Sequence, residues 1–133
     1  MIGDSVATSM MQKALDGVWQ RQKAIATNIA NQETPGYKAI KVSFEKELEK
    51  KVKSLQTSSN SLEEDQNNIF SVKNSKINFI ADYSTSERAD GNNVNVEAEN
   101  IDMAKTQIQY QYLTRGMSDM FSRLRYAISE GKK

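Results

Sequence analysis

Residues 27–38 of this chain read TNIANQETPGYK, and they decide how its first helix ends. Pro35 is followed by Gly36, and this pair suits the two central positions of a type II turn. Thr34 stands directly before the proline, which pushes it out of the helical region. The stretch therefore predicts a helix that ends near Asn31 and a sharp turn immediately after it.

Two asparagines, Asn28 and Asn31, lie one helical turn apart at exposed-looking positions near the end of this helix. Their side chains could bond the last helical carbonyls, a neighbouring subunit, or both. An ordinary helix stop is the simpler alternative, and local sequence does not separate the two interpretations.

Apolar residues recur every three or four positions before this turn, with one polar member, Gln22. They are Met11, Leu15, Val18, Ile25 and Ile29. This heptad-like stripe predicts a helix from about Asp4 to Asn31 that needs a long partner. We expect the partner to be a second helix, from about Val96 to Ser129 and capped by Asn95. The residues expected in its seam are Ile101, Ile108, Leu113, Met117, Met120 and Leu124.

The middle of the chain is less regular. Residues 54–68, SLQTSSNSLEEDQNN, are polar and predict a loop or a disordered excursion. Two short alternating runs follow, at residues 70–72 and 77–81, and favour a small β-hairpin. The predicted fold is mainly α, with the terminal helices paired as a coiled coil. Its three parts are residues 1–31, the irregular residues 32–95, and residues 96–133.

Composition excludes most kinds of chemistry. The chain has no cysteine and no histidine, so the thiol nucleophile, the commonest general base and the usual zinc ligands are absent. The net charge of +1 gives no broad electrostatic footprint for nucleic acid. The segment DGNNVNVEAE, which begins at Asp90, fails as a calcium loop, because Asn95 stands at the required glycine and Ile101 at the bidentate glutamate. We expect no catalytic residue, no metal site, no cofactor and no enzymatic activity.

No apolar run approaches the roughly 18 residues of a membrane span. Charged residues also interrupt the first 30 positions, where a signal peptide would need an unbroken apolar segment. We therefore expect neither a membrane-spanning helix nor a cleaved signal. If the protein leaves the cytoplasm, it uses another route.

Two blocks of sequence resemble bacterial flagellar rod and hook proteins. IATNIANQETPGYKA, residues 25–39, resembles the signature near the N-terminus of that family. DGNNVNVEAENIDMAKTQIQYQYLTRGMSDMFSRLRYAI, residues 90–128, resembles the C-terminal half of a proximal-rod member. Family chains more often carry an acidic residue where Asn95 stands, and either residue caps a helix. The positions that carry the turn motif are Asn28, Asn31, Thr34, Pro35, Gly36 and Tyr37.

The resemblance implies a structural subunit of the proximal rod, packed in a helical tube across the periplasm to transmit torque. It implies export through the flagellar type III apparatus without a cleaved signal. The implied partners are copies of the chain, other rod proteins, the MS ring and its junction protein. Phe44 and Leu48 resemble an aromatic-x-x-x-apolar pair thought to dock on the export gate, although any amphipathic helix supplies one. The alternative is a soluble helical adaptor or chaperone that binds partner helices in a groove.

Overall fold

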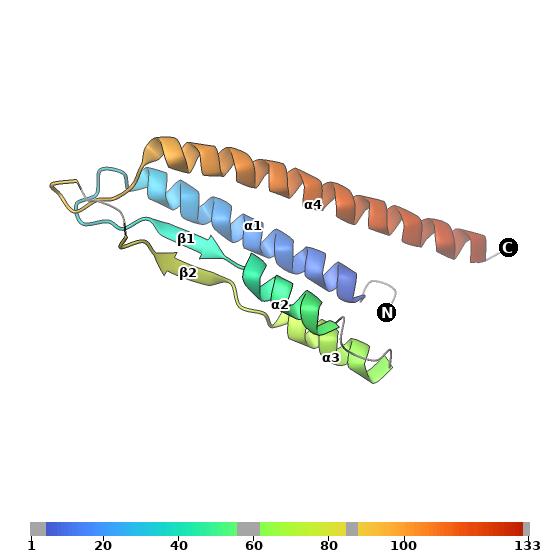
Figure 1. The fold of residues 1–133 in the computed structure, drawn as a ribbon. Coiled ribbons are helices and arrows are strands. Elements are labelled where there is room, and N and C mark those ends of the chain that lie inside the picture. Colours follow the sequence, from blue (N-terminus) through green and yellow to red (C-terminus); the bar gives the residue numbers. More distant parts are fainter. Residues whose placement is uncertain (1–4, 56–61, 85–87, 132–133) are drawn as a thin grey trace.

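The computed structural model describes residues 5–55, 62–84 and 88–131 (Figure 1). The elements in chain order are α1 (Val6–Ala30), β1 (Ile40–Ser43), α2 (Glu45–Leu55), α3 (Leu62–Lys73), β2 (Asn78–Ala81) and α4 (Val96–Gly131). None of the helices in these ranges combines the length and apolarity that crossing a membrane requires.

Helices α1 and α4 run antiparallel along each other, as predicted for the two ends of the chain (Figure 1). Ser5 begins α1 as its N-cap, with its hydroxyl oxygen accepting from the Thr8 N–H at 3.1 Å. Near that end, the Thr8 hydroxyl donates to the Met120 sulfur at 3.1 Å. Halfway along, the Arg21 guanidinium donates to the Gln109 side chain at 3.2 Å. The mainly helical class predicted from the sequence is therefore confirmed.

The core lies where α1, β1 and the start of α2 meet. Its buried members are Val18, Ala24, Val42 and Phe44, and side chains from α2 and α4, among them Leu48 and Leu113, pack against them. The Phe44 ring lies directly over Gly17, in space that a larger residue at position 17 would occupy. The small residue in α1 is thus what lets this ring enter the core.

Arg21 holds several elements together from the edge of this core. Its guanidinium lies 4.9 Å from the centroid of the Phe44 ring and donates to the Val42 carbonyl at 2.9 Å. It also forms an ion pair with Glu45 at 2.6 Å. Together with its bond to α4, these contacts join α1, β1, α2 and α4 through one side chain.

The small sheet differs from the predicted hairpin. β2 pairs antiparallel with β1, Ile40 opposite Ala81 and Ser43 opposite Asn78. Phe70 lies in α3, so the expectation that residues 70–72 form the partner strand was wrong. The runs at residues 70–72 and 77–81 are both short enough to form part of a helix or a strand. The second run pairs with β1, which is distant in the sequence, so local alternation could not indicate this partner.

The polar segment at residues 54–68 is also more helical than expected. Helix α2 continues to Leu55, and α3 starts at Leu62. The rest of the predicted loop, residues 56–61, falls outside the described residues. The helices extend into the polar sequence because one face of each packs on its neighbours, with Ile69 and Val72 of α3 buried.

The residues predicted for the seam between α1 and α4 differ in how far they are buried. Val18 and Ile25 are buried, and Met11, Leu15, Ile29, Leu113, Met117, Met120 and Leu124 are partly buried. Ile101 and Ile108 differ from the prediction, because each is more than half exposed. The polar residues Glu99 and Thr106 are buried here instead, and Ile101 and Ile108 stand two positions further on, about 200° around the helix.

Candidate functional site: an asparagine clasp

The turn after α1 has the predicted geometry. The Tyr37 N–H donates to the Thr34 carbonyl at 3.3 Å, which closes a turn around Pro35 and Gly36. Gly36 has φ +71°, the positive value that the second central position of a type II turn requires. The Thr34 hydroxyl donates to the Asn31 side-chain oxygen at 3.0 Å and so fixes the turn to the end of α1.

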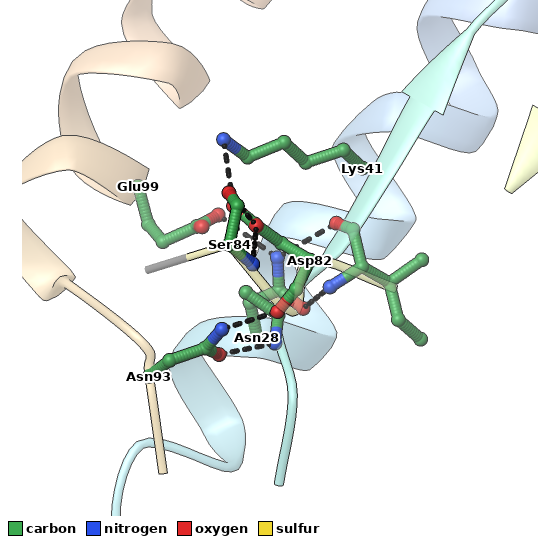
Figure 2. A network of polar contacts seen from close by, with 8 residues as sticks. Asn28, Lys41, Asp82, Ser84, Asn93 and Glu99 are labelled. Carbon is green, nitrogen blue, oxygen red and sulfur yellow. Dashed lines mark hydrogen bonds and ion pairs between the residues drawn. The ribbon is translucent and has the colours of Figure 1, made fainter. Parts of the chain in front are cut away.

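Asn28 is not the exposed amide that the sequence suggested, since only 1% of it is exposed. Its Nδ2 donates to the Ile40 carbonyl at 2.9 Å, and its Oδ1 accepts from the Ile40 N–H at 2.9 Å. The Tyr37 hydroxyl donates to the same Oδ1 at 2.8 Å. Nδ2 also donates to Glu99 at 3.1 Å (Figure 2). The amide thus pairs the N–H and carbonyl of Ile40 as a neighbouring strand would, and it also links α1 to α4.

Asn92, which the sequence did not single out, bonds to the same turn from the segment that precedes α4. It is fully buried, and its Nδ2 donates to the Asn31 carbonyl at 2.8 Å and to the Thr34 carbonyl at 2.9 Å. Its Oδ1 accepts from the Val94 N–H at 2.8 Å. This side chain therefore adds a second hydrogen bond to two carbonyl groups just beyond the end of α1, which also accept from the Thr34 and Tyr37 N–H groups.

Asn93 joins the end of the sheet to the turn before α4. The Ala39 N–H donates to its Oδ1 at 2.7 Å, and its Nδ2 donates to the Asp82 carbonyl (Figure 2). The Gly36 N–H donates to the Asp90 carbonyl at 2.8 Å, so the two turns also meet through their backbones. We call Asn28, Asn92 and Asn93, with the backbone groups that they bind, the asparagine clasp.

The segment before α4 contains a turn and then the predicted helix cap. Gly91 has φ +82°, a positive value that suits glycine in a turn. The Asn95 side-chain oxygen accepts from the Ala98 N–H at 3.2 Å and caps α4. Glu97 and Glu99 lie in the first turn, where negative charge complements the helix dipole.

Burial shapes the electrostatics of the clasp. Burial raises the pKa of Glu99; the bond from Asn28 opposes this rise, and the nearby Asp102 adds to it. The pKa of Tyr37 is also raised, by burial and by the charge of Glu99. Asp82 behaves oppositely: bonds from the Ser84 hydroxyl and N–H, together with Lys41 at 3.2 Å, lower its pKa to about 2 (Figure 2).

The raised pKa of Glu99 predicts a pH dependence of folding. A carboxyl whose pKa is higher in the folded chain binds its proton more tightly there, so its contribution to stability is complete below the unfolded pKa. That contribution is lost as the pH rises through the folded pKa. We expect Glu99→Gln to remove this loss, because a glutamine side chain does not titrate. Its oxygen still accepts the hydrogen bond from Asn28. Urea unfolding from mildly acidic to neutral pH measures the free energy of unfolding of both proteins. Parallel pH profiles would contradict the predicted effect of Glu99.

The clasp is suited to holding backbone segments together. Its asparagine amides bind carbonyl and N–H groups of α1, the turn, β1 and the segment before α4. Among the described residues, no three acidic side chains are grouped closely enough to hold a metal ion. The buried side-chain oxygen and nitrogen atoms of these residues all have hydrogen-bond partners. The arrangement therefore acts as a fixed connection between the two long helices.

Sequence reasoning found the turn but missed its counterpart. The signal was the run of amides at residues 92, 93 and 95, because buried asparagine serves backbone groups that have no ladder partner. Phe44 directly precedes α2, and Leu48 lies in its first turn; Phe44 is buried and Leu48 partly buried. The structure therefore places this pair in the core of the folded chain.

The fold and the clasp define a class of protein: an antiparallel pair of long helices, closed at one end by two polar turns and carrying a small side module. Comparison with protein-family models finds no match. Curated relatives do match over most of the chain. It is 36% identical over 123 residues to the flagellar basal body rod protein FlgB of Bacillus subtilis, covering 92% of each chain.

Two further relatives carry the same name. FlgB of Buchnera aphidicola is 36% identical over 107 residues, covering 75% of this chain and 77% of its own. FlgB of Borreliella burgdorferi is 30% identical over 122 residues, covering 80% and 84%. The chain belongs to the FlgB family of flagellar basal body rod proteins, and it is a structural component of the rod.

Proposed function

We propose that this chain is a proximal-rod subunit that polymerises through its α1–α4 pair and transmits torque across the periplasm. The observation that carries the proposal is the uncovered apolar surface on α4. Two sets of large apolar residues lie on opposite sides of this helix, and both stay exposed although α1 packs beside them. An assembly subunit needs such surface, whereas a monomer rarely exposes it.

The first flank follows one line along α4. Its members are Ile101, Ile108, Tyr112 and Tyr126, all exposed. Separations of 7, 4 and 14 residues return to within about 40° of the same direction on a helix with 3.6 residues per turn. A stripe of this kind is suited to packing against another helix.

The second flank lies about half a turn away. Tyr110, Phe121 and Ile128 point to this side, and the first two line an open groove of about 440 Å³ between α1 and α4. Leu15 and Trp19 of α1 form the opposite wall. Because the two flanks differ and face opposite ways, one copy can offer its first flank to the next copy's groove. A contact of this heterologous kind repeats into rings or helical tubes.

The asparagine clasp supports the mechanical part of the proposal. Torque applied at one long helix reaches the other only if their connection is stiff. The buried amides of Asn28 and Asn92 bond both turns and both helices at this end, and small rotations of the helices would break several bonds together. A stiff connection between the two long helices also favours a rod subunit over a soluble adaptor, whose groove would bind one partner helix.

The remaining proposed partners follow from membership of the family. They are further rod proteins, the MS ring with its junction protein, and the type III export apparatus, used without a cleaved signal. The export pair Phe44 and Leu48 adds a condition, because the folded chain buries Phe44. We propose that the gate meets these residues only in an unfolded chain.

Replacing an exposed residue of the first flank tests assembly separately from folding. We expect Ile108→Asp to leave the unfolding midpoint of the purified chain nearly unchanged, since the position is exposed. Buried between subunits, however, the new charge would cost several kcal/mol. Basal bodies counted by electron microscopy should therefore fall almost to zero.

The matched control is Gln111→Asp, an equal charge change at an exposed position between the two flanks. Cells carrying it should build normal rods and swim. Secreted subunit is measured in both strains, so that an export defect is recognised. Normal basal-body counts with Ile108→Asp would exclude the first flank as an assembly surface.

A further inference from the structure

Within the described ranges, strand β2 has a paired strand on one backbone edge only. It lies on the side of β1 that faces away from α1 and α4 (Figure 1). The Asp82 N–H donates to the Ala39 carbonyl at 2.8 Å, which makes these two residues a hydrogen-bonded pair next to the sheet. Because such pairs alternate along an antiparallel ladder, Ile80 bonds to β1, whereas the backbone groups of Phe79 and Ala81 point away from it.

The backbone groups on the two edges of this sheet differ in their hydrogen bonding. On the inner edge, the backbone of Ile40 is paired by the Asn28 amide and the Val42 carbonyl by Arg21. On the outer edge, the outward N–H and C=O groups of β2 meet no hydrogen-bond partner among the described residues. A row of such groups is a template for another strand.

The side chains of β2 do not protect this edge either. Phe79 and Ile80 point to opposite faces of the sheet, yet they are 57% and 56% exposed. The sequence of the strand, NFIA, contains no charge and no proline, the residues that commonly block pairing at an edge. The edge is therefore open in its backbone and apolar on both faces.

We propose that β2 pairs antiparallel with β2 of a second copy of this chain, around a two-fold axis at Ile80. The edge is complementary to itself, since its outward residues stand one position before and one position after Ile80. Phe79 of each copy then faces Ala81 of the other, so a large side chain meets a small one and both backbones exchange hydrogen bonds. The two Ile80 side chains form the close, non-hydrogen-bonded pair at the centre.

This contact is separate from the assembly contacts proposed for the rod. A two-fold pairing closes on itself and adds no third copy, whereas rod growth needs an open, repeating contact. The pairing therefore belongs to the chain before assembly. It gives the exposed strand a defined partner in place of uncontrolled edge-to-edge association.

Opposite charges at the central pair provide the sharpest test. We expect the purified protein to sediment as two chains at high concentration, and Ile80→Lys and Ile80→Glu each to sediment as one, because like charges then face each other. Mixing the two variants should restore the two-chain mass, since the position meets its own counterpart. Far-ultraviolet circular dichroism shows that each variant is folded, and the rescue excludes a folding defect as the cause.

A second pair of variants tests the backbone. Ala81→Pro removes an N–H that points outward, so it should abolish pairing while β1 and β2 stay joined; Ala81→Ser keeps the N–H and should still pair. A single-chain mass for the unmodified protein over about a hundredfold range of concentration would overturn the proposal. So would a mixture of the charged variants that stays monomeric. Basal-body counts are measured independently, so failure here leaves the rod function standing.

Discussion

Gly17→Ala is expected to lower the free energy of unfolding by about 2 kcal/mol or more, although alanine is the better helix former. A Cβ at this position would lie 2.4 Å from Cγ and Cδ1 of the Phe44 ring. Overpacking typically costs roughly 1–3 kcal/mol and occasionally more, and so short an approach to two ring atoms places the cost at the upper end of that range. The gain from replacing glycine in a helix is only roughly 0.5–1 kcal/mol. Phe44 is buried beneath Arg21 and has little room to move. Thermal unfolding should show a midpoint lowered by roughly 8 °C.

Gly116→Ala is the matched control on the facing helix. Its Cβ would meet only the terminal methyl of Met11, at 3.3 Å, and that flexible side chain can turn aside. We expect this variant to be as stable as the unmodified chain or slightly more stable. If Gly17→Ala unfolds at the same temperature as Gly116→Ala, the close contact between α1 and Phe44 is not a feature of the protein.

Asn28→Asp is expected to cost about 3 kcal/mol near neutral pH, although the two side chains have the same shape. The carboxylate keeps the bonds from the Tyr37 hydroxyl and the Ile40 N–H but cannot donate, so the Ile40 carbonyl loses its partner. It also brings a second negative charge next to Glu99, in place of an Nδ2 that lies 3.1 Å from it. Urea unfolding measures the loss.

The pH dependence of this loss identifies its cause. Two neighbouring carboxylates raise each other's pKa, and the folded chain then gains stability as acidification protonates them. The deficit should therefore shrink from neutral to mildly acidic pH. The control Asn95→Asp should show no loss at either pH, because aspartate caps a helix as well as asparagine does. A deficit that does not change with pH would mean that charge repulsion with Glu99 is absent.

The sequence by itself determined the features that depend on neighbouring residues. The heptad-like stripe through Val18 and Ile25 specified a long helix, because burial at a 3.6-residue period needs no knowledge of the partner. Pro35 and Gly36 specified the turn, because their backbone preferences are local. The cap at Asn95 followed from the same kind of reasoning.

The pattern of apolar residues did not predict the burial of polar residues that have hydrogen-bond partners. Ile101 and Ile108 were placed in the seam because a seam is normally apolar, yet Glu99 and Thr106 are buried there. Glu99 accepts from Asn28, and the Thr106 hydroxyl donates to the Asp102 carbonyl at 2.7 Å. Satisfied hydrogen bonds make such burial tolerable, and one helix considered alone does not show them.

Only the tertiary structure decided which distant segments meet. β2 joined β1, about 40 residues earlier, and Asn92 reached back to Asn31 and Thr34, about 60 residues earlier. Local preference carries no information about such pairs, because their stability comes from matching donors and acceptors once water is excluded. The clasp therefore exists only when the two ends of the chain are packed together, although its asparagines are plain in the sequence.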